Sequence, residues 1–179
     1  MSAFSNPASS TPDQVRDYVT SLLDTLGSRE PIEVLRETPD ALRSLIRGMS
    51  ELQLSRPEKP GKWSVREVIQ HLADSELVGS FRFRMALAQD RPPVPGYDQD
   101  AWAANLRYQE SSVEDALGDF GRLRAANLRL FTRATPAELQ RVVIHAERGE
   151  ESLARLMQLY AAHDLVHRNQ IVRIRGAIG

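Results

Sequence analysis

The chain has 179 residues, a formal net charge of −1, 41% hydrophobic residues and 26% charged residues. These values are ordinary for a single globular domain. The near-neutral charge gives no general attraction to nucleic acid or to an anionic membrane, and no apolar run approaches the roughly 20 residues of a membrane span. We therefore expect neither nucleic acid nor a membrane as a partner.

The first ten residues, MSAFSNPASS, lack the basic region and the apolar stretch of a secretory signal. We predict a short disordered lead-in over residues 1–10, a single domain over residues 11–179, and a cytoplasmic location. Cysteine is absent, so a transition metal would have to be held by histidine and carboxylate. The four histidines are His71, His145, His163 and His167.

Helix-start signals recur along the chain. Thr-Pro pairs open at Thr11, Thr38 and Thr135, and serine capping boxes are predicted at Ser64 and Ser111. Behind these signals, apolar residues recur at helical spacing over 15–26, 42–49, 65–83, 113–131 and 153–174. The pattern predicts an all-α fold.

Two long breaks, residues 55–63 and 89–100, separate the predicted helices. Strand signals are weak, and residues 142–151 could hold one short strand before a turn at Gly149. Several helices with one wet face each fit a four-helix bundle with long connecting loops, and such loops often cover a site.

Three of the predicted helices carry polar groups where leucine would be expected. His167 and Asp164 fall near the centre of the last apolar stripe, Glu76 lies in the middle of an earlier one, and Arg124 and Asn127 interrupt a third. A buried polar group costs about 1–3 kcal/mol without a partner. These groups are therefore expected to partner one another, a metal, or water in a cavity.

His163 and His167, four residues apart, lie one above the other on a helix and can reach one metal ion. His71, on another long helix, is the better candidate for a third ligand, and His145, in a predicted loop, is the weaker one. A zinc protease motif would need glutamate where Asp164 stands, and a di-iron bundle would need a second Glu-x-x-His copy. A mononuclear three-histidine site remains, beside the plainer interpretation that these histidines are satisfied by backbone or water.

Three separated segments, residues 63–76 (WSVREVIQHLADSE), 95–103 (PGYDQDAWA) and 163–171 (HDLVHRNQI), together resemble the DinB-like superfamily. They look most similar to its YfiT-like branch of metal-dependent hydrolases and bacillithiol S-transferases. The resemblance implies a four-helix bundle, commonly dimeric, and a divalent metal, nickel or zinc, bound by three histidines. The matching positions are His71, His163 and His167.

Other residues have two interpretations each. Glu76 could support a ligand or act as a general base, and Asp164 could orient an imidazole, accept a proton or pair with Arg124. Arg124 and Asn127 could bind an anionic substrate or only satisfy Asp164. Tyr97 and Trp102, the latter just beyond the 89–100 break, belong to a segment that could close over the metal and bind substrate, or could simply pack.

The favoured function is a metal-dependent transferase that activates a low-molecular-weight thiol, such as bacillithiol, for attack on an electrophile. Because the chain has no cysteine, the thiol must arrive as a cosubstrate. The alternatives are metal-dependent hydrolysis, with water in place of the thiol, and a non-catalytic, stress-linked metal-binding protein. A structural metal usually has four protein ligands, so three histidines favour catalysis.

Overall fold

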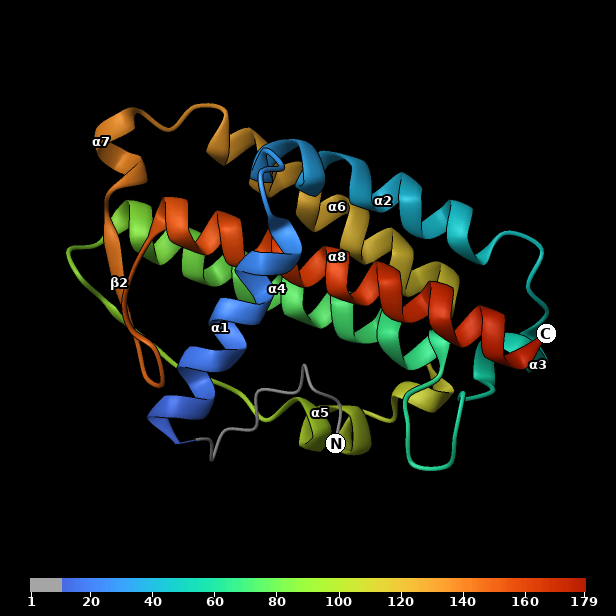
Figure 1. The fold of residues 1–179 in the computed structure, drawn as a ribbon. Helices are drawn as coiled ribbons and strands as arrows, with labels where there is room; N and C mark the ends of the chain where they lie inside the picture. Colours follow the sequence, from blue (N-terminus) through green and yellow to red (C-terminus); the bar gives the residue numbers. More distant parts are fainter. Residues whose placement is uncertain (1–10) are drawn as a thin grey trace.

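The computed structural model describes residues 11–179, and the predicted lead-in over residues 1–10 lies outside this range. Four long helices form a bundle (Figure 1): α2 (Pro31–Ile46), α4 (Val65–Ala88), α6 (Val113–Phe131) and α8 (Leu153–Ile178). The chain runs in one direction in α2 and α8 and in the other in α4 and α6. The predicted four-helix bundle is thus confirmed, with α1 (Pro12–Leu26) packed along α8.

Side-chain caps explain where most of these helices begin. Thr11 and Gln14 form a capping box at α1, and Ser64 and Glu67 form one at α4, where the Ser64 backbone N–H donates to Glu67 Oε2 over 2.7 Å. The shorter elements between the long helices are α3 (Glu51–Ser55), α5 (Gln99–Asn105), the 3₁₀ helix η1 (Tyr108–Glu110) and α7 (Pro136–Leu139).

The predicted helix start at Thr38 is wrong, because α2 begins at Pro31 and continues through Pro39. Proline has no N–H, so Pro39 leaves the carbonyl of Leu35, one turn earlier, without its helical donor. Arg124 Nη1 of α6 donates to that oxygen over 2.8 Å. A partner from another helix therefore compensates for the interior proline, which a local sequence signal cannot show.

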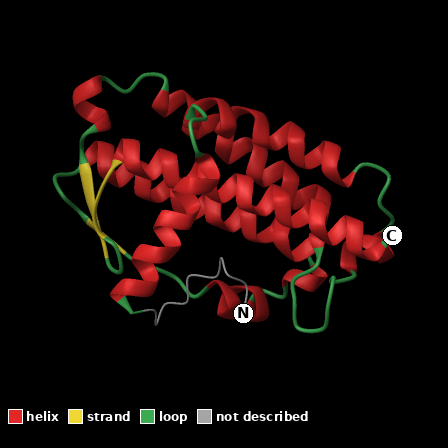
Figure 2. Cartoon of the chain, in the orientation of Figure 1, coloured by secondary structure: helices red, strands yellow, loops and turns green. Residues whose placement is uncertain are grey.

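A small sheet closes one end of the bundle (Figure 2). Its strands are β1 (Pro93–Val94), β2 (Val142–His145) and β3 (Gly149–Ser152), in the order β1-β2-β3. Only one short strand was predicted, over residues 142–151, whereas two lie there and a third lies in the 89–100 break. The parallel pairing of Val94 with His145 ties that segment to the hairpin. His145, expected in a loop, is the last residue of β2.

The core consists of two apolar clusters along α4 and α8. Phe83 and Tyr160 belong to the cluster next to the sheet, and Ile69 and Ile171 belong to the one at the far end. Along α8, His167 lies between the last residue of the first cluster, Val166, and the first residue of the second, Ile171. Within residues 11–179, no helix has both the length and the apolar character needed to cross a bilayer.

Candidate metal centre

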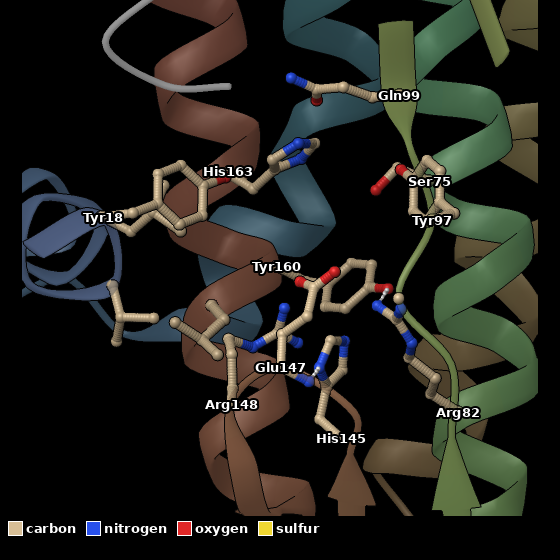
Figure 3. Close-up of a pocket in the computed structure, with 14 residues that line it drawn as sticks. Tyr18, Ser75, Arg82, Tyr97, Gln99, His145, Glu147, Arg148, Tyr160 and His163 are labelled. Atoms are coloured by element: carbon tan, nitrogen blue, oxygen red, sulfur yellow. Dashed lines mark hydrogen bonds between the residues drawn. The ribbon is translucent and has the colours of Figure 1, made fainter. Parts of the chain in front are cut away.

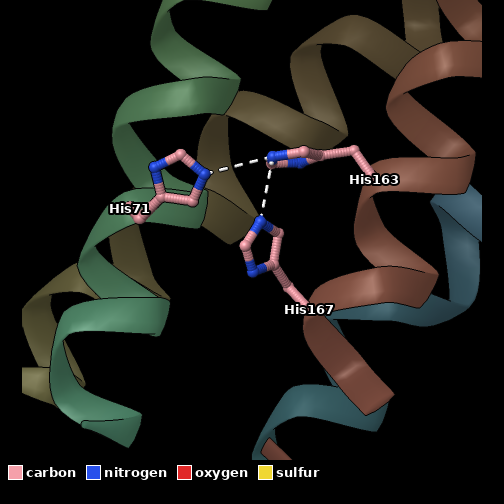
Figure 4. A group of neighbouring side chains, drawn as sticks. All are labelled: His71, His163 and His167. Carbon is pink, nitrogen blue, oxygen red and sulfur yellow. Dashed lines mark hydrogen bonds between the residues drawn. The ribbon is translucent and has the colours of Figure 1, made fainter. Parts of the chain in front are cut away.

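Three imidazoles meet inside the bundle (Figure 4): His71 from α4, and His163 and His167 one turn apart on α8. The Nε2 atom of His163 lies 3.1 Å from Nε2 of His71 and 3.1 Å from Nε2 of His167. His71 and His167 are buried, and His163 is partly exposed. The structure thus brings together the three predicted ligands, while His145 lies outside the cluster.

Hydrogen bonds among the three imidazoles alone cannot satisfy all of their ring nitrogens. His167 Nδ1 lies 2.8 Å from Gln170 Oε1, an acceptor, so Nδ1 carries the proton and Nε2 of a neutral ring carries a lone pair. His163 Nε2 lies between the other two Nε2 atoms and carries either one N–H or one lone pair, so it can form a normal hydrogen bond to only one of them. A divalent cation held by His71, His163 and His167 would instead accept all three lone pairs, which suits nitrogen atoms this close together.

Burial keeps these imidazoles in the neutral form that can bind a metal. It lowers the pKa of His71 and of His167 well below 6.5, and neighbouring histidines lower both further. Burial, followed by the charges of Arg124 and Arg148, lowers the pKa of His163 to about 4. At neutral pH all three nitrogen lone pairs are therefore available to a divalent metal.

A second polar cluster, the Arg124 network, crosses the bundle beside the histidines. The Arg124 guanidinium donates to both oxygens of Glu76, with Nε and Nη2 each at 2.9 Å. It also donates to both oxygens of Asp164, at 2.6 and 3.1 Å. Asn127 Nδ2 donates to Glu76 Oε1 over 2.7 Å. All four side chains are buried, and the network joins α4, α6 and α8.

These hydrogen bonds limit the roles that Asp164, Arg124 and Asn127 can have. Asp164 pairs with Arg124 and orients no imidazole by a hydrogen bond. Arg124 and Asn127, which we expected to bind an anionic substrate, are 1% and 0% exposed and do not line the pocket described below. Their observed contacts support the alternative, in which they satisfy buried carboxylates.

A pocket that is open to solvent leads from His163 to the sheet (Figure 3), and it measures about 620 Å³ when the solvent at its mouth is counted. His163 lies at one end, and Arg82, His145 and Arg148 lie at the other. Tyr97 also lines the pocket, so part of the 89–100 segment does border the site. Trp102 is not among the lining residues, and its ring packs against that of Tyr97 with centroids 4.6 Å apart.

Arg82 and Arg148 line the pocket but were not predicted from the sequence as site residues. One signal was available on α4, where the small residues Ser75 and Gly79 precede Arg82 at helical spacing and leave room beside α8. A Cβ at position 79 would lie 2.5 Å from Cε1 of Tyr160, so only glycine fits there. Arg148 gave no comparable signal, because it lies in the turn between β2 and β3.

Comparison with known proteins agrees with this fold. A model of the DinB superfamily matches residues 35–171, which is most of the chain. The chain belongs to the DinB superfamily. This range contains all three histidines of the cluster and the whole Arg124 network.

Relatives within the DinB superfamily carry names that refer to metal chemistry. A protein of Bacillus mycoides, 30% identical over 80% of this chain and 83% of its own length, is named "Putative metal-dependent hydrolase". YfiT of Bacillus subtilis, with the same name, is 30% identical over 83% of this chain and 84% of its own length. A solved YfiT structure has a TM-score of 0.74 and 27% identity, covering 82% of this chain and 86% of that one. It is described as "a probable metal-dependent hydrolase with an unusual four-helix bundle topology".

We expect the Gln170→Ala variant of this DinB-superfamily chain to bind a divalent metal about 10–100-fold more weakly. Gln170 fixes the His167 proton on Nδ1 and thereby turns the Nε2 lone pair toward the cluster. The affinity is measured by competition with a chromophoric chelator. Asn169→Ala, an exposed neighbour on the same helix, should leave the affinity unchanged, and equal affinities for the two variants would contradict the role of Gln170.

The metal-free protein should lose stability as the pH falls from about 6.5 toward 4. Unfolded histidine has a pKa near 6.5, whereas burial lowers the pKa of folded His163 to about 4, so the unfolded chain binds the proton first. The loss at pH 5 should be on the order of 2 kcal/mol for each such histidine. Urea unfolding of chelator-treated protein at pH 7.5, 6 and 5 measures it. The double variant His71→Gln/His167→Gln should lose less stability over this pH range than the wild type. An equally steep loss of stability would contradict the assignment of the pH dependence to these histidines.

Proposed function

We propose that this protein is a metal-dependent transferase that activates a low-molecular-weight thiol for attack on an electrophile. The observation that carries the proposal is the convergence of three histidine Nε2 atoms, with one of the three residues, His163, lining an open pocket. Within the described part of the chain, no fourth residue joins this ligand group. Three protein ligands leave a coordination position for a ligand from outside, as in catalytic zinc sites.

His71, His163 and His167 would hold the metal, which when bound supplies a positive charge that lowers the pKa of a coordinated thiol or water. Neutral imidazoles leave the full charge of the ion available for this effect. Gln170 keeps the His167 lone pair directed at the site, and the ring of Trp63 packs against His71 with centroids 4.9 Å apart. These contacts hold two of the three ligands in position before any substrate arrives.

The ordinary acidity of the two candidate nucleophiles favours a thiol over water. A free thiol already ionises at about 8.5, whereas water starts from about 15.7 and depends on the full effect of a bound metal, which lowers its pKa to about 7 in carbonic anhydrase. Glu76 and Asp164 were predicted as candidate proton acceptors, but Arg124 engages both oxygens of each. We therefore assign them the task of positioning α4, α6 and α8 around the histidines.

The hydrolase alternative has the names of the relatives in its favour, and a non-catalytic, stress-linked metal-binding protein is the third candidate. The family resemblance supports further proposals about this chain: bacillithiol as the thiol, nickel or zinc as the metal, a homodimer, and a cytoplasmic location.

Burial raises the pKa of the Tyr97 phenol, which stays protonated and can donate a hydrogen bond to a ligand in the pocket.

The deciding experiment follows conjugation of bacillithiol to monochlorobimane by the purified protein. We expect metal-dependent conjugation that chelation abolishes and that added zinc or nickel restores. His71→Ala should be inactive, and Arg91→Met, on the exposed surface, should match the wild type. If no thiol reacts but an ester or amide is cleaved, the hydrolase alternative takes over. If neither reaction occurs, the metal is structural.

A further inference from the structure

Arg82 of α4 is a buried cation without an anionic partner. Arg82 is 5% exposed and forms no ion pair with any residue of the described range 11–179. Nη1 donates to the Tyr160 hydroxyl over 3.2 Å and Nη2 donates to the Pro95 carbonyl over 2.6 Å, both neutral oxygens. Nε is buried with no hydrogen-bond partner. An unpaired charge in the interior is costly, so such an arginine is expected to have a functional counter-ion.

His145 contributes a second unpartnered donor to the same end of the pocket. The backbone N–H of Glu147 donates to His145 Nδ1 over 3.2 Å, so the neutral ring carries its proton on Nε2. His145 is 1% exposed, and its Nε2 is buried without a partner. Burial, with the charges of Arg148 and Arg82, lowers the pKa of His145 to about 3 and keeps the ring neutral. Figure 3 shows both side chains beside Tyr160, at the end of the pocket away from His163.

We propose that Arg82 and His145 form a carboxylate-binding subsite that recognises the far end of an elongated substrate. The metal-facing end of the pocket begins near Ser75 and His163, and Ser75 lies two turns before Arg82 on α4. Seven residues of helix span about 10 Å, which sets the distance between the reacting group and the carboxylate. The proposal rests on the proposed function only in assuming that the same molecule reaches the histidine cluster.

Arg148 and Glu147, the other charged residues at this end of the pocket, are less suited than Arg82 to bind a carboxylate. Arg148 is already paired with Glu151, with Nε and Nη2 at 2.7 and 2.8 Å from its two oxygens. Glu147 also lines the pocket, and its carboxylate lies against Gly96, where any Cβ would collide with it. Figure 3 shows the Glu147 side chain beside Tyr160, so its negative charge lies near the proposed subsite and should weaken, rather than create, binding of an anion.

The test compares two thiols of equal length, 8-mercaptooctanoate and 8-mercapto-1-octanol, by isothermal titration of the metal-loaded full-length protein. The wild type should bind the carboxylate at least ~10-fold more tightly than the alcohol, because a charge-assisted hydrogen bond is stronger than a neutral one. Arg82→Met should remove this preference. Arg91→Met, which removes an exposed arginine outside the pocket, should retain it. Equal affinities in the wild type, or a full preference in Arg82→Met, would overturn the proposal.

Two further variants keep the test decisive if Arg82→Met does not fold. His145→Phe keeps the ring but removes the donor, so the preference for the carboxylate should shrink, whereas Glu147→Gln removes a like charge and should enlarge it. The opposite changes would count against the subsite. A carboxylate preference that depends on Arg82, without any thiol transfer, would refute the proposed function alone. Thiol transfer without any carboxylate preference would refute the subsite alone.

Discussion

The His167→Ala variant should lose its metal during purification. It removes one of three ligands, and since loss of a ligand's supporting partner alone typically costs 10–100-fold, the affinity should fall by more than about 100-fold. His71→Ala and His163→Ala should behave in the same way, because all three Nε2 atoms lie within 4.8 Å of one another. Metal content per chain is measured by inductively coupled plasma mass spectrometry after desalting.

His145→Ala is the matched control, because His145 is the only other histidine in the sequence. It lies at the end of β2, outside the ligand group, so this variant should keep about one divalent ion per chain. Full occupancy in His167→Ala would refute the three-histidine assignment. Loss of metal from His145→Ala would show that a structural change at the sheet reaches the metal centre.

The parts of the fold that follow from local signals could be predicted from the sequence. The capping boxes at Thr11 and Ser64 fix helix starts through contacts between residues three apart, which the sequence displays directly. The spacing of His163 and His167 places both on one face of any helix that contains them. His71 could be added because it lies on a second long helix, and the chain offers only four histidines.

Features that depend on distant partners could not be predicted in the same way. Pro39 signals a helix break locally, yet α2 continues because Arg124 satisfies the Leu35 carbonyl. The parallel pairing of Val94 with His145 joins segments about fifty residues apart, and neither strand is long enough to show a period. The polar interruption at Arg124 was visible in the sequence, but the choice between an anionic substrate and two buried carboxylates required the packing of three helices.

Arg124→Leu should be among the most destabilising substitutions in the chain, with a loss of about 3–5 kcal/mol in the free energy of unfolding. Burial alone would lower the pKa of Arg124, but the charges of Asp164 and Glu76 raise it, so the guanidinium stays charged. Its removal leaves two carboxylates, each 2% exposed or less, without a counter-ion, and the Leu35 carbonyl without a donor. Urea denaturation of the metal-free protein measures the effect. Arg122→Leu, which removes an exposed arginine paired with Asp119 at 2.8 Å, should change stability by less than about 0.5 kcal/mol.

A triple variant separates the charge effect from simple loss of packing. Replacing Arg124, Glu76 and Asp164 together by leucine removes the uncompensated carboxylates, so it should regain most of the stability that Arg124→Leu loses. If the triple variant is instead less stable than Arg124→Leu, the shape of the network matters more than its charge balance. Metal content gives an independent measurement, since none of the three side chains is a ligand. If the triple variant is stable but binds metal weakly, the Arg124 network positions His163 and His167 on α8, as the proposed function requires.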